Sequence, residues 1–412
     1  MESTPFKSNT IFFAPLWTDD YEHFISVIKK DLRYRTLPKD EIPQYLLPYI
    51  TRIYCNDSLF SEFELASEHF PDLCMFDSRF PAGGEAKVQS IRLSCFSTGC
   101  VFMEFQVVYQ GLSLDDIADF SFRFKNANST DKSASEKIKM KDAIAALLPA
   151  NSGCCAFYAS SDIKNECKMF HQILLDEVPA QETLEKHLVH LRRGYHKEFP
   201  IPVIGEDFDM LFEPYKYDHW AGSQEGLVNI FHLTESTSTN SFLTKYKPKH
   251  LAVDYRFLYL VLLNQRFSAI VYLGKIPFIR SYTRKHREKM NMLTSSLKTL
   301  FSFSIVSDDQ LFQTIYAKMY SIMGIDRLLA DIRDNEEQIE LLQNHEMLNA
   351  EKKTSVFLFG LSILSLFSVL VDAAGYFDRF PLLASVSTAL SALCLCVIIV
   401  AYLIWWLCYK RK

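Results

Sequence analysis

The sequence predicts an α+β (α/β) cytosolic domain, then a long stalk helix and two C-terminal transmembrane helices. Three patterns indicate this. Residues 355–371 and 380–408 contain no Asp, Glu, Lys, Arg or His, strand-type and helix-type patterns alternate over the first 250 residues, and apolar residues then recur near heptad spacing. We expect this organisation: 1–250 α/β domain, 251–306 helical section, 307–354 stalk helix, 355–375 first span, 376–380 outer loop, 381–408 second span and 409–412 basic tail.

Composition indicates one sizeable folded body with an apolar appendage. With 49% apolar and 23% charged residues, the chain leaves little room for long disordered tracts. The net charge of −5 disfavours direct nucleic-acid binding, which needs a basic domain or stripe. Seven of the ten cysteines precede residue 168 at irregular spacings, which predicts reduced cytosolic thiols without a zinc or disulfide pattern.

The first 250 residues carry the signals of a mixed sheet. Residues 9–17 read as a first strand, and 88–95 with 100–108 read as a hairpin around Ser97, Thr98 and Gly99. Ser113 followed by Asp116 resembles a capping box that opens a helix. The remaining expected elements are helices at 113–127, 134–148, 164–177 and 181–195, strands at 154–159 and 227–233, and an extended piece at 242–246.

The apolar stretch 251–273 could be mistaken for a third membrane span. Asp254, Arg256 and the polar triplet 264–266 interrupt it at positions that would lie within the membrane. Burying such groups in lipid costs several kcal/mol. We therefore expect a buried soluble helix, which Pro277 ends.

The stalk is predicted from residues 307–353. A helix running unbroken over 308–371 would be about 96 Å long at 1.5 Å per residue. Gly324 is its weak point, either a kink or a close contact. A seam suited to self-association would be formed by Leu311, Ile315, Ile322, Ile325, Leu328, Ile332, Asn335, Ile339 and Leu342.

Flanking charges predict the orientation of the two spans. Lys352 and Lys353 precede the first span, and basic residues 410–412 follow the second, whereas the connecting loop is mostly acidic. Because cytoplasmic flanks carry the excess of Lys and Arg, both termini are expected in the cytoplasm. The predicted location is the inner or plasma membrane, as a multi-pass protein.

The first span has a polar face. At 100° per residue, four serines and an aspartate fall within about 140° of one another. Hydroxyls could line a water path, and a ring of carboxylates from several subunits would attract cations. The alternative interpretation is that the serines permit close helix packing. The candidate pore residues are Ser355, Ser362, Ser365, Ser368 and Asp372, with Gly375, Tyr376 and Phe377 at the mouth.

The order of these parts resembles the CorA-like family of two-span metal-ion transporters and channels. The family's diagnostic Gly-Met-Asn falls where this chain has Gly375, Tyr376 and Phe377, so only the glycine matches. Magnesium uptake is therefore not carried over, although a divalent-cation transporter stays an alternative. The resemblance implies a homo-oligomeric funnel, commonly a pentamer, whose cytosolic domains gate a central pore.

Divergent proteins that resemble CorA include accessory proteins of type III CRISPR antiviral systems. The resemblance to them implies a cytosolic domain that senses a nucleotide second messenger made from S-adenosylmethionine and ATP (SAM-AMP). No glycine-rich phosphate loop accompanies this hypothesis. The candidate ligand contacts, each alternatively a surface charge, are Arg192, Arg193, Lys245, Lys247, Lys249, Arg284, Lys285 and Arg287.

An enzyme is the competing class of function. Its best support is His187, His190 and His196, but no Glu or Cys completes a recognisable metal set and no catalytic motif is present. We expect no catalytic residues and no structural metal, and the sequence does not identify a cofactor. A membrane-anchored scaffold or enzyme without a pore remains the third interpretation.

Overall fold

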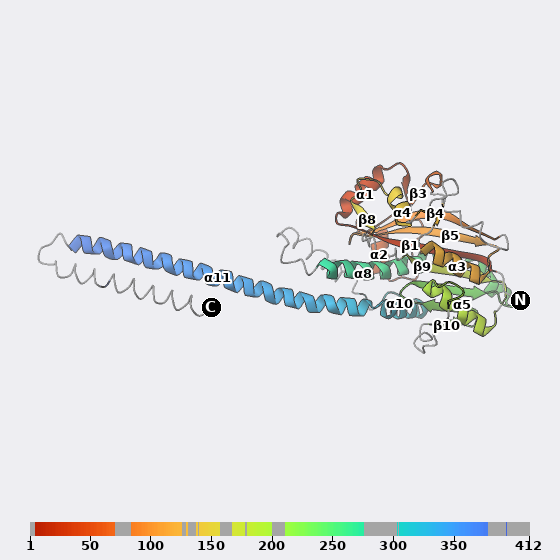
Figure 1. The fold of residues 1–412 in the computed structure, drawn as a ribbon. Coiled ribbons are helices and arrows are strands. Elements are labelled where there is room, and N and C mark those ends of the chain that lie inside the picture. Colours follow the sequence, from red (N-terminus) through yellow and green to blue (C-terminus); the bar gives the residue numbers. More distant parts are fainter. Residues whose placement is uncertain are drawn as a thin grey trace. The chain divides into compact units, whose positions relative to one another are not determined.

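A computed structural model describes residues 5–70, 84–125, 129–130, 137–138, 140–156, 167–177, 179–199, 211–275, 303, 305–377 and 393 (Figure 1). Its contacts divide the chain into two units, Met1–Ile332 and Arg333–Lys412. The first unit is an α+β sheet domain and the second carries most of one long helix, which confirms the predicted fold class at this level.

A ten-stranded sheet forms the centre of the first unit. The strand order is β10-β11-β12-β9-β1-β5-β4-β3-β2, with β8 also paired to β1. All pairs are antiparallel except β9 with β12. The strands are β1 Pro5–Thr18, β2 Tyr34–Thr36, β3 Phe60–Leu65, β4 Glu85–Phe96, β5 Cys100–Gln110, β8 Cys154–Ala156, β9 Lys168–Leu175, β10 Leu211–Tyr215, β11 Asp218–Gly222 and β12 Gly226–His232. A separate small ladder joins β6 Ser129–Thr130 to β7 Lys137–Ile138.

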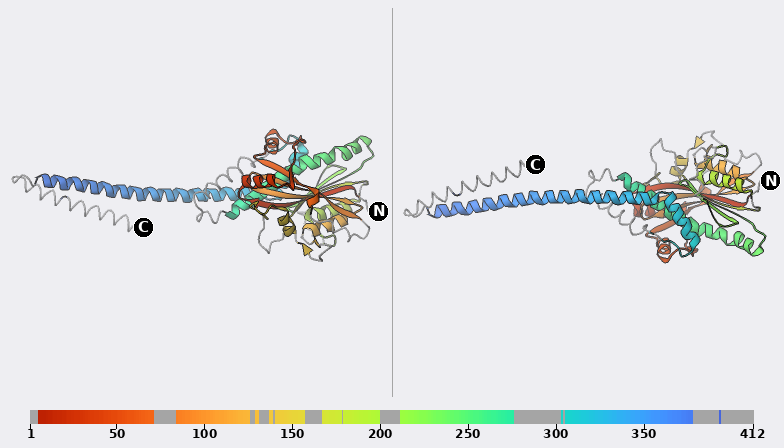
Figure 2. Two further views of the ribbon diagram at one scale, coloured as in Figure 1. Left: turned by 90° about the horizontal axis from the view of Figure 1, so that it is seen from above. Right: turned by 90° about the horizontal axis from the view of Figure 1, so that it is seen from below.

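Helices cover both faces of the sheet (Figure 2). Because successive side chains of a strand point to opposite faces of the sheet, consecutive residues of β1 pack into different hydrophobic cores. Phe12 packs against Phe124 with ring centroids 4.2 Å apart, whereas Phe13 packs against Tyr259 at 5.4 Å. The helices are α1 Tyr21–Lys30, α2 Pro48–Cys55, α3 Leu114–Lys125, α4 Met140–Leu147, α5 Gln181–Arg193, α6 Thr237–Lys245, α7 Lys247–His250, α8 Arg256–Lys275, α10 Gln310–Ile322 and α11 Ile325–Phe377, with a π-turn at Leu251–Tyr255 before α8.

Several local predictions are confirmed. The hairpin β4–β5 turns at Gly99, whose φ of 96° suits glycine. Helix α3 begins with the reciprocal cap, because Asp116 N donates to Ser113 Oγ at 3.1 Å and Ser113 N donates to Asp116 Oδ2 at 3.4 Å. The helix expected at 181–195 is α5, which ends at Arg193 because Gly194 adopts the left-handed conformation.

Three local predictions are wrong. The helix expected at 164–177 is strand β9, whose eight side chains are all buried because it lies inside the sheet, between β12 and β1. Its apolar pairs 169–170 and 173–174 are four residues apart, which is helical spacing, and the polar His171 and Gln172 between them break the alternation typical of a strand. Both polar side chains are buried with partners, since His171 bonds to Thr10 and Gln172 donates to the Leu251 carbonyl. The extended piece at 242–246 belongs to helix α6, since Ser236 caps it by accepting from Thr239 N. Within the helix expected at 134–148, the described residues form β7 and the shorter α4.

Helix α8 is a core helix, as predicted. The helical run Thr237–Lys275 is, among the residues described, the one stretch that passes a test of length and hydropathy for a membrane span, and 72% of its apolar window is buried. Its polar residues have partners in the sheet domain. Arg256 pairs with Glu62 and Glu104, and Asn264 Oδ1 accepts from Thr98 Oγ1 at 2.7 Å.

The stalk helix is not unbroken over 308–371, and it breaks at the weak point expected at Gly324. The chain forms two helices, α10 and α11, separated at Gly324, which has a φ of 63°. The first part of the predicted seam is also wrong as a surface for self-association. Ile315, Ile325 and Ile332 are 3%, 0% and 4% exposed within the core of the first unit, because they pack on their own domain.

Candidate functional site

The predicted pore residues all lie on α11. Ser355, Ser362, Ser365, Ser368 and Asp372 are exposed, and Ser362 Oγ donates to the Leu358 carbonyl at 2.9 Å, a bond within its own helix. Large apolar side chains on the same stretch are also exposed, and they are Val356, Phe357, Leu358, Phe359, Leu361, Leu364, Leu366 and Val369.

The predicted mouth residues Gly375, Tyr376 and Phe377 form the last turn of α11. The helix therefore continues for two residues into the expected outer loop. Of the predicted second span, 381–408, only Leu393 is described, and it is exposed. Arg284, Lys285 and Arg287 lie outside the described residues.

Of the arginines predicted as ligand contacts, Arg192 and Arg193 are described, and both bond to groups of their own domain. Arg192 is fully buried, and its Nη1 donates to the Gly222 carbonyl at 3.1 Å, so it joins α5 to β11. Arg193 Nη1 donates to the Tyr195 hydroxyl at 3.1 Å. Neither arginine lines the two cavities described next.

The three described lysines among the predicted ligand contacts lie on α6 and α7 but in different environments. Lys245 is exposed, with its ammonium 5.4 Å from the Tyr246 ring centroid. Lys247 is only 5% exposed and forms an ion pair with Asp218. Burial lowers the pKa of Lys247, and Asp218 opposes that shift. Lys249 is exposed at the rim of a cavity.

An aromatic cavity of about 210 Å³ lies beside this buried ion pair. Phe312 stacks between Tyr255, at 4.0 Å, and Tyr45, at 5.0 Å. Tyr215 and Tyr217 form a second stacked pair with centroids 5.3 Å apart. The lining side chains come from the loop before α2, the β10–β11 turn, α6 to the start of α8, and the start of α10: Tyr45, Tyr215, Tyr217, Asp218, Phe242, Lys247, His250, Tyr255, Asp309, Leu311 and Phe312.

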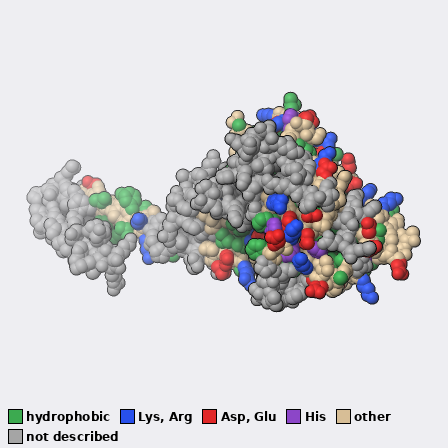
Figure 3. All heavy atoms as spheres, turned by 45° about the vertical axis from the view of Figure 1, so that its right-hand side comes forward, with side chains coloured by type: hydrophobic (Ala, Val, Ile, Leu, Met, Phe, Trp, Pro, Cys, Tyr) green, Lys and Arg blue, Asp and Glu red, His purple; other side chains and the backbone are tan. Residues whose placement is uncertain are grey.

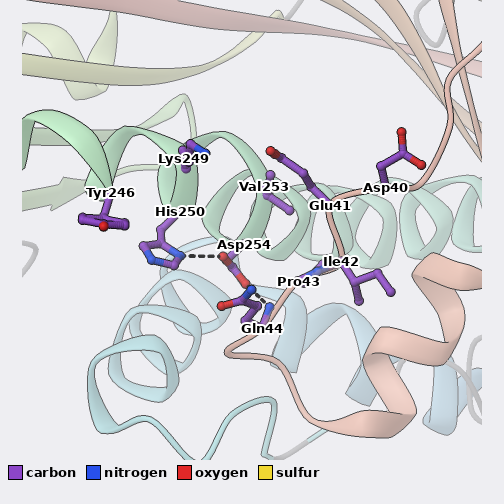
Figure 4. A pocket seen from close by; sticks show the side chains of 10 residues that line it. All are labelled: Asp40, Glu41, Ile42, Pro43, Gln44, Tyr246, Lys249, His250, Val253 and Asp254. Carbon is purple, nitrogen blue, oxygen red and sulfur yellow. Dashed lines mark hydrogen bonds and ion pairs between the residues drawn. The ribbon is translucent and has the colours of Figure 1, made fainter. Parts of the chain in front are cut away.

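An acidic cavity of about 780 Å³ shares His250 with the aromatic cavity. Figure 4 shows Asp254 at its base, between His250 and the backbone of Gln44. Asp254 Oδ1 accepts from Gln44 N at 2.6 Å, and Oδ2 contacts His250 Nδ1 at 3.0 Å. Its lining residues are Asp40, Glu41, Ile42, Pro43, Gln44, Tyr246, Lys249, His250, Val253 and Asp254.

Carboxylates outnumber cations around these two cavities. The five carboxylates face two lysines and one histidine. The charged side chains are Asp40, Glu41, Asp218, Asp254, Asp309, Lys247, Lys249 and His250. Figure 3 shows basic, acidic and His side chains intermingled in the middle of one face of the molecule, without a broad basic patch there. This arrangement suits a cationic or neutral ligand better than a phosphate.

The histidines considered for an enzyme site are individually partnered. His187 contacts Asp115 at 3.4 Å, His190 Nε2 contacts the Phe199 carbonyl at 3.1 Å, and His196 contacts Asp119 at 3.5 Å. In the part of the chain that the structure describes, no group of three or more His, Cys, Asp or Glu side chains is arranged to hold a metal ion.

Sequence reasoning missed the aromatic side chains of the cavity. Tyr215, Tyr217 and Asp218 lie in the short run Glu-Pro-Tyr-Lys-Tyr-Asp, a turn-like signal rich in aromatic residues that could have marked the site. Tyr45 and Phe312 carry no such signal, because they are 267 positions apart (312 − 45) and meet only through folding.

Comparisons with protein-family models, curated proteins and solved structures gave no match for this chain.

Proposed function

We propose that this chain is one subunit of a homo-oligomeric, CorA-like membrane ion channel, controlled by its N-terminal α+β domain. The observation that supports this best is the exposed apolar stretch of α11, from Val356 to Val369, within a segment free of charged residues. A contiguous apolar surface of this kind is unfavourable in water and would be covered in a lipid bilayer. The charge-free stretch 380–408 would supply the second span.

Several subunits are needed for a pore, because two helices cannot enclose one. In such an assembly the serine face of α11 would line the path, and Asp372 of each subunit would contribute to a carboxylate ring. A cation channel is the expected outcome. The number of subunits expected from the resemblance is five.

Control from the cytosol needs a ligand that binds the open and closed states with different affinities. The two cavities of the first unit are the places where such a ligand would bind. The resemblance supplies a nucleotide messenger of type III CRISPR defence as the candidate ligand. The predominance of carboxylates around the two cavities disfavours the phosphate of such a messenger and favours a cationic group on the ligand.

The test is conductance of the purified full-length protein in planar bilayers. Wild type is compared with Asp372→Asn and with Glu22→Gln, which neutralises an exposed carboxylate of the N-terminal domain. Each is measured with and without nucleotides and divalent ions on the cytosolic side. We expect a cation-selective current that Asp372→Asn reduces several-fold and Glu22→Gln leaves unchanged.

Absence of current under every condition, from protein that is folded and oligomeric, would contradict the channel. The membrane-anchored scaffold would then be the better account. Current with unaltered selectivity in Asp372→Asn would keep the channel but remove the proposed carboxylate ring.

A further inference from the structure

We propose that the aromatic cavity is a binding site for a small organic cation, such as a quaternary ammonium group. Binding itself is independent of ion conduction. Only the role of this cation as the controlling ligand rests on the channel function proposed above.

Six of the eleven residues that line the cavity are Tyr or Phe, and their rings differ in exposure. Tyr255 and Phe312 are 6% and 3% exposed and form a fixed inner stack, whereas Tyr45, Tyr215 and Phe242 are 38%, 52% and 44% exposed at the mouth. Burying large aromatic side chains is strongly favourable, so three exposed rings around one cavity leave apolar surface for a ligand to cover. The faces of aromatic rings attract cations, and aromatic cages are a known means of binding quaternary ammonium groups.

The surrounding charge favours a cation over an anion. The ammonium of Lys247 is already paired with Asp218, so it adds no net positive charge. Asp309 accepts from the backbone N–H groups of Leu311 and Phe312, which leaves its negative charge in place at the wall. Asp254 lies beyond the shared His250 in the acidic cavity, and a phosphate here would face these carboxylates.

The dimensions favour a small group. Cavities that bury a drug-sized ligand usually measure about 300–1,000 Å³. At about 210 Å³ the aromatic cavity is smaller, and the adjoining acidic cavity of about 780 Å³ gives room for the rest of a larger molecule. A cationic head in the aromatic cavity, with its remainder in the acidic cavity, fits both volumes.

The test compares choline with 3,3-dimethylbutan-1-ol, its neutral isostere, by calorimetric titration of the full-length protein in a non-ionic detergent. The two probes share shape and hydroxyl group and differ in charge. We expect choline to bind at least tenfold more tightly. Tetramethylammonium should compete with choline for the same site.

Matched variants locate the site. Phe242→Ala and Tyr215→Ala should each weaken choline binding by about tenfold, because each removes one exposed ring. Asp309→Asn removes a charge but retains a good N-cap for α10, so it should weaken binding without unfolding the helix. Phe199→Ala removes a ring of similar exposure, 53%, outside both cavities, and it should leave the affinity for choline unchanged.

Three results would overturn the proposal. The first is that the neutral isostere binds as tightly as choline, and the second is that neither choline nor tetramethylammonium binds at millimolar concentration. The third is that inorganic phosphate displaces choline more effectively than tetramethylammonium does. Choline binding without ionic current would retain this site and reject the channel. Current that responds to another ligand, with no choline binding, would retain the channel and reject this site.

Discussion

Arg256 Nε donates to Glu104 Oε2 at 2.6 Å, although the two residues lie 152 positions apart. Arg256 Nη2 also donates to Glu62 Oε1 at 2.5 Å, and all three side chains are buried. The first residue of α8 is therefore tied to β5 and β3 at once. Ser94 Oγ also donates to both carboxylates, and Arg256 is the cation that bonds directly to each of them, so this arginine helps to hold α8 on the sheet.

Arg256→Met should lower the free energy of unfolding of the first unit by about 3–5 kcal/mol, because it leaves two buried carboxylates without their cation. Chemical unfolding followed by tryptophan fluorescence measures the change. Arg35→Met is the matched control, since Arg35 is 74% exposed in its pair with Glu64 and should cost at most about 1 kcal/mol. Equal losses in both variants would contradict the structural role of Arg256.

The same cluster predicts a pH dependence. Burial raises the pKa of Glu62, but the attraction and hydrogen bonding of Arg256 outweigh it and hold that pKa below its ordinary value. A lowered pKa stabilises the folded protein above the ordinary value of about 4.3, and this contribution is lost as the pH falls through the folded-state pKa. Without Arg256, only the weaker effects of Arg92 and the Ser94 hydroxyl still oppose burial, so the pKa of Glu62 rises. The destabilisation by Arg256→Met should therefore be largest at pH 7 and shrink toward pH 4, and a pH-independent difference would exclude this mechanism.

Gly324→Ala and Gly274→Ala should shift stability in opposite directions. A Cβ at either position meets no atom within 4 Å, so only the backbone matters. Gly324 has a φ of 63°, where a side chain costs about 1–2 kcal/mol. Gly274 lies in the last turn of α8, where alanine should gain up to about 1 kcal/mol. Thermal unfolding of the two variants measures both shifts, and stabilisation by Gly324→Ala would show that the break between α10 and α11 is not required.

Ile325→Ala should destabilise the first unit by about 2–5 kcal/mol and leave the oligomeric state unchanged, because Ile325 is fully buried in its own domain. Leu348→Ala, at a side chain 55% exposed on the same helix, should leave the stability of that unit unchanged. Unfolding measurements are paired with light scattering. If Ile325→Ala dissociated the oligomer without lowering the stability of the first unit, Ile325 would instead lie in a contact between subunits.

Local signals in the sequence were sufficient for much of the fold. β1, the β4–β5 hairpin, the capped start of α3 and the burial of α8 were predictable, because each depends on alternation, capping residues or polar interruptions within a short window. The charge-free stretches near the C-terminus are likewise a property of the sequence alone, and the channel proposal depends on them.

Tertiary structure alone decided the remainder. β9 is a strand because its apolar side chains are buried on both faces of the sheet, and the first part of the heptad pattern packs inward because its own domain covers it. Lys247 is not a free cation because folding places it beside Asp218. Tyr45 and Phe312 become neighbours in the same way. The sequence determines which local elements form and which side chains tend to be buried. Contacts between distant segments determine which partner each side chain meets. The aromatic cavity consists of such contacts.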